Sequence, residues 1–284
     1  MYFLVHFCTK ILRKTKKILI VIQRSNGDVF LSEDLINSIY DDYSHPPQID
    51  LLVNDDTYQI AKLLPNINII HTFSYQQKKD QRLNQEIKLF KRLFRKYDLS
   101  INLTSSDRSV IYALLAAKNS ISIVEKDNKK SWWKKKLLGD YYYYDDTKHI
   151  HTQNLTPLNL LQIKHKIVQK LPHIPEQILF NLKTKLKNKK IKNFIIFHPS
   201  AQYKYKIYPE AHRNKLLSYL NTLGVAVIVT GANNEIDLAI KNRLPSLTNV
   251  YDFIGETSIE EYFSLCKLSL AYIGMDTLNM HIAA

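Results

Sequence analysis

Residues 18–29 read ILIVIQRSNGDV, and this stretch decides the fold. Its first part, Ile18 to Ile22, is continuously apolar, as expected for a strand that helices cover on both faces. The run Ser25-Asn26-Gly27-Asp28 breaks the strand, and a helix-like segment follows from about Ser32 to Tyr43. A buried strand, a turn and a helix form the opening unit of a parallel α/β sheet with right-handed crossovers.

The same alternation continues along the chain in two blocks. In the first block we predict strands at 49–53, 67–70, 99–103 and 121–124, and helices at 83–97, 109–118 and about 157–171. In the second block we predict strands at 194–197, 225–230 and 268–273, and helices at 209–223, 233–243, 258–266 and 277–284. The predicted fold is α/β, with two doubly wound Rossmann-like halves.

The two blocks predict two domains, 17–171 and 193–284, joined by a linker at 172–192 that holds two prolines and a lysine-rich run. Residues 1–16 form an N-terminal extension. Its apolar part is followed by basic residues, whereas in a secretory signal the basic residues come first. We therefore expect a flexible extension or a weak interfacial anchor. No stretch approaches the roughly 20 apolar residues of a membrane-spanning helix.

The chain of 284 residues carries 40 Lys and Arg against 26 Asp and Glu, a net charge of +14. This excess suits nucleic acid, anionic lipid headgroups or a phosphorylated glycolipid, or else it is a solvated lysine-rich surface. No zinc-finger or RNA-binding signature accompanies the basic clusters. Cys8 and Cys266 lie far apart without metal-like or redox-like spacing, so a reduced, cytoplasmic protein without a metal site is predicted.

Strand-to-helix turns are the places to look for chemistry, because open parallel sheets bind ligands outside the carboxyl ends of their strands. In the first turn, Gly27 permits a tight turn, and Asp28 is either a general base or the N-cap of the next helix. In the second, His198-Pro199-Ser200 is followed by Lys204 and Lys206, which either bind an anion or form a plain surface loop.

The third turn runs from Gly274 to His281. Asp276 is expected to cap a helix beginning at Thr277, whose free N–H groups would face a phosphate. Thr277 and His281 share a helix face, which indicates a ligand or, alternatively, a lone buried histidine. Glu235 either accepts hydrogen bonds from a ribose or is an ordinary first-turn acid.

These turns together resemble the glycosyltransferase family 9 heptosyltransferases, which build the inner core of bacterial lipopolysaccharide. The resemblance covers residues 17–284 and rests on five motifs in order. They are ILIVIQRSNGDV, His198-Pro199-Ser200 with Lys206-Ile207-Tyr208-Pro209, Thr230-Gly231 with Glu235, IGETS at 254–258, and residues 274–284.

The resemblance implies a GT-B fold, two Rossmann-like domains with the active site between them. It implies inverting transfer of heptose from ADP-heptose to a lipid A–Kdo/heptose core at the inner face of the bacterial inner membrane, with no cofactor and no metal. Nucleic acid is not an expected partner. Asp28 would be the general base. The donor would be held by Ser200, Lys206, Glu235, Asp276, Thr277 and His281.

Acceptor-side candidates are Arg24, Trp132 and Trp133. Arg24 stands near the place where the family often has a basic residue after the first strand. The aromatic stretch 132–144 lies beside lysines, as loops at headgroup interfaces do, although an ordinary packed loop would read the same way.

Two departures from the family pattern bear on activity. Leu278 stands where the family usually has glycine, which makes a related donor sugar conceivable. The family continues beyond the His281 helix, so the sequence predicts a truncated second domain. The alternative is therefore an inactive remnant that binds at most a nucleotide or a membrane surface.

Overall fold

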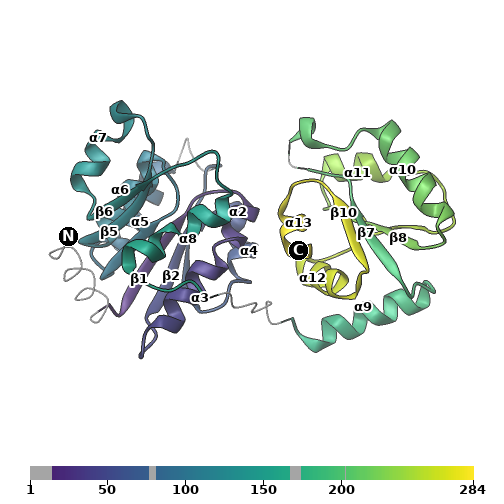
Figure 1. Cartoon of the computed structure of the whole chain (residues 1–284), viewed down its shortest axis with the longest axis horizontal. Coiled ribbons are helices and arrows are strands. Elements are labelled where there is room, and N and C mark those ends of the chain that lie inside the picture. Colours follow the sequence, from purple (N-terminus) through teal and green to yellow (C-terminus); the bar gives the residue numbers. More distant parts are fainter. Residues whose placement is uncertain (1–14, 77–80, 167–173, 202) are drawn as a thin grey trace. The chain divides into compact units, whose positions relative to one another are not determined.

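The computed structural model describes residues 15–76, 81–166, 174–201 and 203–284 (Figure 1). The chain forms two compact units, Met1–Pro172 and His173–Ala284. Each unit is an open parallel sheet with helices packed on it. The predicted α/β fold with two doubly wound halves is confirmed. Residues 1–14, which hold most of the predicted extension, lie outside the described residues.

The first unit contains six parallel strands in the order β3-β2-β1-β4-β5-β6. Their bounds are β1 Lys17–Ile22, β2 Gln48–Asn54, β3 Ile67–Phe73, β4 Leu99–Asn102, β5 Asn119–Val124 and β6 Asp140–Tyr143. At the centre, Ile20 of β1 pairs with Leu51 of β2 and Ile101 of β4, and all three side chains are fully buried. Burial from both faces explains why β1 is apolar without alternation.

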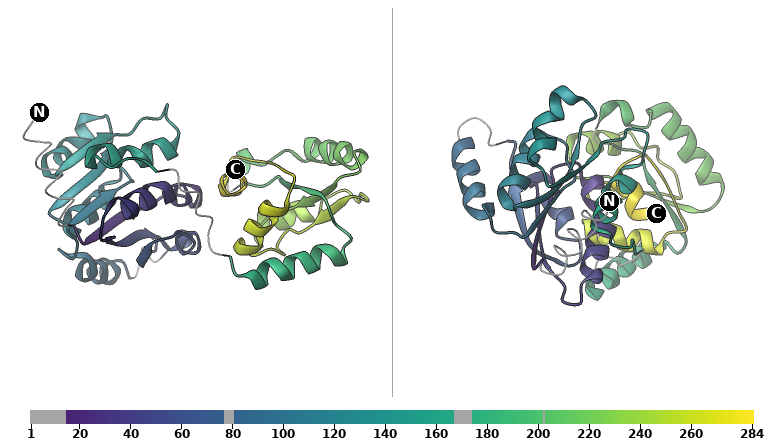
Figure 2. Two further views of the ribbon diagram at one scale, coloured as in Figure 1. Left: turned by 60° about the horizontal axis from the view of Figure 1, so that its bottom comes forward. Right: turned by 60° about the vertical axis from the view of Figure 1, so that its left-hand side comes forward.

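The helices of this unit cover both faces of the sheet (Figures 1 and 2). They are α2 Asn26–Phe30, α3 Glu33–Asp42, α4 Tyr58–Ala61, α5 Arg82–Leu93, α6 Asp107–Ala116, α7 Asn128–Leu137 and α8 Ile150–Leu161, with a 3₁₀ turn η1 at Asp55–Thr57. Right-handed crossovers put α5, α6 and α7 on one face and α3 and α4 on the other, where α8 packs against α3.

The second unit contains four parallel strands in the order β10-β7-β8-β9. The strands are β7 Phe194–His198, β8 Ala226–Val229, β9 Val250–Asp252 and β10 Ala271–Gly274. The helices are α9 Glu176–Asn188, α10 Glu210–Thr222, α11 Glu235–Lys241, α12 Ile259–Leu268 and α13 Leu278–Ala283, with a 3₁₀ turn η2 at Lys204–Lys206. Its core gathers Phe197, Leu217, Val227 and Val229 under these helices.

The predicted linker contains a helix of the second unit. The structure folds residues 176–188 of the predicted 172–192 linker into α9, which packs against α12. Leu182 and Leu186 are buried one turn apart, while lysines occupy the other sides of the helix. The lysine-rich composition concealed this amphipathic pattern. The helix expected near 157–171 also begins earlier, at Ile150, and ends at Leu161.

The aromatic stretch 132–144 is a helix and a strand rather than a loop. The side chain of Asp127 accepts a hydrogen bond from the main-chain N–H of Lys129 and caps α7, and β6 then pairs with β5. Trp133 packs against the cluster of Val110, Val124 and Leu138, whereas Trp132 is 61% exposed.

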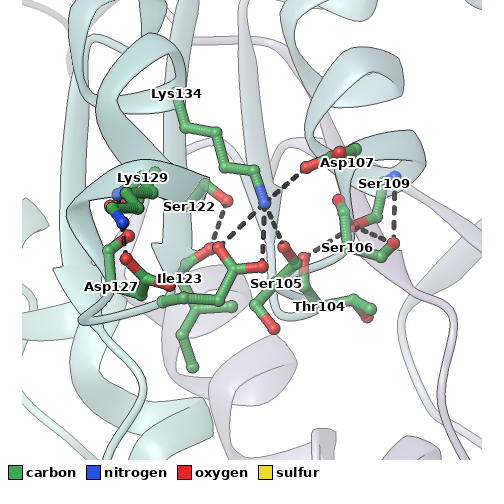
Figure 3. Close-up of polar contacts among 12 residues, drawn as sticks. Thr104, Ser105, Ser106, Asp107, Ser109, Ser122, Ile123, Asp127, Lys129 and Lys134 are labelled. Atoms are coloured by element: carbon green, nitrogen blue, oxygen red, sulfur yellow. Dashed lines mark hydrogen bonds and ion pairs between the residues drawn. The ribbon is translucent and has the colours of Figure 1, made fainter.

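Lys134 fastens α7 to the neighbouring loops (Figure 3). Its side chain is fully buried, and its Nζ donates to the carbonyl oxygen of Ser105 at 2.6 Å and to the carboxylate of Glu125 at 2.8 Å and 3.0 Å. Asp107 Oδ1 lies 2.8 Å from the same nitrogen. A buried ammonium is tolerated here because two carboxylates and a carbonyl replace its water.

We expect Lys134→Met to destabilise the first unit by about 2 kcal/mol, because Glu125 and the Ser105 carbonyl lose their donor while Glu125 and Asp107 keep partial solvation. Urea unfolding followed by tryptophan fluorescence measures this, since both tryptophans, Trp132 and Trp133, lie in α7. The matched control is Lys136→Met on the exposed side of the same helix. Equal unfolding midpoints for the two variants would contradict the anchoring role of Lys134.

Candidate functional site

Each sheet reverses its strand order at one place, and open parallel sheets bind ligands at such switch points. In the first sheet the reversal lies between β1 and β4, and in the second between β7 and β10. The turn with Asp28 follows β1. The turns with Ser200 and Asp276 follow β7 and β10. Of the predicted site residues, Arg24, Asp28, Ser200, Lys206, Asp276, Thr277 and His281 follow strands beside these reversals, whereas Trp132, Trp133 and Glu235 do not.

Asp28 lies in the first turn of α2 and does not cap that helix. Ser25 is the N-cap, and its hydroxyl oxygen accepts a hydrogen bond from the main-chain N–H of Asp28. The capping interpretation of Asp28 is therefore wrong, because Ser25 already occupies the capping position three residues earlier. Gly27 lies inside α2 with an ordinary helical backbone rather than in a left-handed turn.

One oxygen of the Asp28 carboxylate is held by two donors. Oδ2 accepts from Arg24 Nε at 3.1 Å and from Ser25 Oγ at 3.0 Å. The side chain of Asp28 is 20% exposed. Within the described part of the chain, Oδ1 has no hydrogen-bond partner. The carboxylate is thus oriented through Oδ2, and Oδ1 has no donor among the described residues.

Arg24 is brought to Asp28, but the two tryptophans are not. The guanidinium of Arg24 lies 5.9 Å from the centre of the Tyr144 ring, and Asn154 Nδ2 donates to the main-chain oxygen of Asp28 at 3.3 Å. No contact joins Trp132 or Trp133 to Asp28 among the described residues. Of the three acceptor-side candidates, Arg24 is the one that contacts Asp28 among the described residues.

Lys206 and Asp276 meet across the switch point of the second sheet. Gly274 pairs with His198 in the parallel ladder, and the Met275 N–H donates to the His198 carbonyl at 3.2 Å. These bonds hold the turn after β10 beside the turn after β7. Lys206 Nζ then lies 3.4 Å from Asp276 Oδ2. Both side chains are partly exposed, so the ammonium remains accessible to an anion.

The N-cap of α13 is Thr277 rather than Asp276. Thr277 has an extended backbone and makes no side-chain cap bond, and its hydroxyl donates to the Met275 carbonyl at 3.5 Å. The predicted cap was one residue early because Asp276 turns to Lys206 instead. His281 is half-buried in the last turn of α13.

The sequence reasoning missed Asp237, which organises the turn after β8. Its carboxylate accepts hydrogen bonds from the Ser200 hydroxyl, the Ala232 main-chain N–H and Asn234 Nδ2. Ser200 is thus buried and engaged with Asp237, whereas Glu235 is exposed at the start of α11. The signal was present, because Asn234 and Asp237 stand at N-cap and N3 of this helix.

His198 joins the three turns of the second unit. Its Nδ1 lies 3.1 Å from Thr230 Oγ1, after β8, and 2.9 Å from Asn279 Nδ2, on α13. Burial lowers the pKa of His198 from its usual value to about 4, so the ring is neutral at pH 7. A neutral ring can accept a hydrogen bond from the Asn279 amide, which fixes α13 against the end of β7.

Because the folded-state pKa of His198 is below its unfolded value, unfolding takes up a proton in acid. We expect the contribution of His198 to stability to be complete above about pH 6.5 and to fall by about 3 kcal/mol as the pH drops towards 4. This contribution is measured as the difference in unfolding free energy between the wild type and His198→Gln at pH values from about 4 to about 6.5. An NMR titration in which the His198 ring charges near pH 6.5 would refute the assignment.

The described helices include none long and apolar enough to span a membrane. Over residues 15–76, 81–166, 174–201 and 203–284, no three His, Cys, Asp or Glu side chains are placed to share a metal ion.

The chain is similar to several known proteins. Lipopolysaccharide heptosyltransferase 3 of Escherichia coli K12 is 24% identical over 268 residues, which is 92% of this chain and 77% of that protein. A family 9 glycosyl transferase from Veillonella parvula superimposes with a TM-score of 0.75 at 17% identity over 94% of this chain and 77% of its own. The structure of E. coli heptosyltransferase WaaC with ADP superimposes with a TM-score of 0.71 at 15% identity, over 94% of this chain and 83% of its own.

The fold is therefore that of the GT-B-type glycosyltransferases. The family model described as glycosyltransferase family 9 (heptosyltransferase) matches residues 86–284, which is more than half of the chain. The chain belongs to glycosyltransferase family 9, the heptosyltransferases, and is a glycosyltransferase.

Proposed function

We propose that this glycosyltransferase moves a heptose, or a related sugar, from an ADP-sugar to the inner core of lipopolysaccharide, with inversion at the anomeric carbon. The observation that carries the proposal is the meeting of Lys206 and Asp276 across the switch point of the second sheet. A relative of this fold binds ADP, and the matched E. coli protein is a lipopolysaccharide heptosyltransferase.

Lys206 is the proposed partner of the donor diphosphate. Its ammonium would neutralise the charge that develops on ADP as the bond to the sugar breaks, and this stabilises the transition state. Asp276 keeps the lysine oriented at 3.4 Å until the diphosphate binds. We assign Ser200, Thr277 and His281 to the surroundings of the diphosphate and the sugar, and Glu235 to the ribose. No cofactor forms part of the proposal.

Asp28 is the proposed general base. The acceptor hydroxyl would give its proton to the carboxylate while its oxygen attacks the anomeric carbon, and ADP would leave with the electrons of the broken bond. One displacement of this kind inverts the anomeric centre. Oδ1 of Asp28, which has no partner among the described residues, suits proton transfer, and Arg24 holds the other oxygen in place.

We expect Asp28→Asn to lower the transfer rate by about 10²–10⁴-fold, because general-base catalysis contributes that much and the amide cannot accept the proton. Donor affinity should stay within about twofold of wild type, since Asn keeps the size of the side chain. Asp56→Asn, an exposed carboxylate of the same unit, is the matched control and should leave the rate unchanged. Full activity of Asp28→Asn would remove the base assignment.

We expect Lys206→Gln to weaken ADP binding by about 10- to 100-fold, the range for loss of a hydrogen bond to a charged group. Calorimetric titration with ADP measures it, with raised salt weakening the wild type more than the variant. Lys204→Gln in the same turn is the control, since Lys204 is exposed and has no ion-pair partner within the described residues. Equal affinities for the two variants would contradict the role of Lys206.

A further inference from the structure

An apolar stripe lies uncovered on α5 of the first unit. Its side chains are 43% to 78% exposed and follow one another at intervals of three or four residues, so they line one side of the helix. They are Leu83, Ile87 and Phe90, together with Phe94, the C-cap residue of the helix. The rings of Phe90 and Phe94 stack with centres 4.8 Å apart. A different side of α5 makes the core contact, where Leu89 and Leu93 are buried.

The stripe belongs to a helix layer with further exposed apolar side chains. Ile111 on α6 and Trp132 and Leu137 on α7 are 45% to 62% exposed, and right-handed crossovers put these helices on the same face of the sheet as α5 (Figures 1 and 2). Trp133 packs against Val110 of α6, so α7 is fixed within this layer. On the opposite face, α3 and α8 expose no large apolar side chain among the described residues.

Charge divides the two helix layers in the same way. Four Lys and Arg lie in α5, one in α6 and five in α7, against only Glu86 and Asp107. On the other face, α3 and α8 hold four acidic residues and no Lys or Arg. Of the five lysines of α7, Lys134 is turned inward and paired, so it does not contribute to the surface.

Exposed Leu, Ile, Phe and Trp side chains interleaved with Lys and Arg match an anionic bilayer surface. The apolar groups enter the boundary between headgroups and acyl chains, and each basic residue near the surface is attracted to anionic lipid. The phosphates of a nucleic acid would pair with the basic residues, but the apolar stripe of α5 would then have no partner. The combination therefore favours lipid.

We propose that the outer surface of α5, α6 and α7 in the first unit docks on an anionic lipid bilayer, with α3 and α8 turned towards water. This inference deepens the proposed function and rests on it for the lipid-linked acceptor, which is presented at such a surface. Docking through this layer would orient the first unit relative to the bilayer.

The intrinsic fluorescence of the chain reports on this surface directly, because its only tryptophans are Trp132 and Trp133 of α7. The probe is a vesicle of phosphatidylglycerol and phosphatidylcholine in equal parts, compared with pure phosphatidylcholine. We expect the emission to shift to the blue and to be quenched by brominated lipid on the anionic vesicles only. In Trp132→Phe the vesicle-induced shift should be largely lost, because Trp133 is already packed.

Two surface variants separate the apolar and the electrostatic parts of binding. Ile87→Ser with Phe90→Ser, and Lys88→Gln with Lys91→Gln, should each weaken partitioning by about tenfold or more. Controls remove similar groups from the second unit: Phe180→Ser with Tyr219→Ser, and Lys183→Gln with Lys187→Gln. All four of these side chains are exposed, and the controls should stay within about twofold of wild type.

Wild-type partitioning in both α5 variants, or equal binding to neutral and anionic vesicles, would overturn the proposal. So would binding of duplex DNA that vesicles cannot displace. ADP affinity and transfer to a water-soluble core oligosaccharide are measured on the same variants. In these variants ADP affinity and transfer should stay at the wild-type level. In the wild type, vesicle binding without transfer counts against the proposed reaction only, and transfer without binding to anionic vesicles counts against the docking surface only.

Discussion

A parallel sheet with right-handed crossovers must reverse its strand order to have helices on both faces, and this constraint places everything else in the chain. The reversal beside β1 lies at the carboxyl end of that strand, where Asp28 and Arg24 follow it. The reversal beside β7 does the same for Lys206 and Asp276. Gly274 is needed at the second reversal, because a Cβ there would lie 2.8 Å from the His198 carbonyl oxygen.

Apolar runs and ordered turns let the sequence predict the two doubly wound halves and most of their elements. Elements were predicted poorly where lysines or aromatic residues obscure the periodicity of the buried apolar side chains. Lysines masked the buried Leu182 and Leu186 of α9, and the aromatic and lysine-rich stretch 132–144 concealed a crossover helix and an edge strand. Both depend on tertiary contacts that a local reading of the chain does not contain.

The candidate site was predictable at the level of turns and less so at the level of atoms. The pairing of Arg24 with Asp28 and of Lys206 with Asp276 depends on which rotamers the folded turns allow. Asp237 and His198 are buried polar groups that bind neighbouring turns together, and their importance comes from contacts distant in sequence. Likewise, the net charge of +14 does not say which surface is basic. The fold separates the basic helices α5, α6 and α7 from the acidic helix α3.

The proposed reaction is a single displacement on an ADP-sugar, in which Asp28 takes the acceptor proton and Lys206 neutralises charge on the leaving diphosphate. The most direct measurement is the anomeric configuration of the product, determined by NMR after incubation of the purified chain with ADP-heptose and a core oligosaccharide. We expect transfer with inversion relative to the donor. A product with retained configuration, or the absence of any transfer by the folded chain, would contradict it.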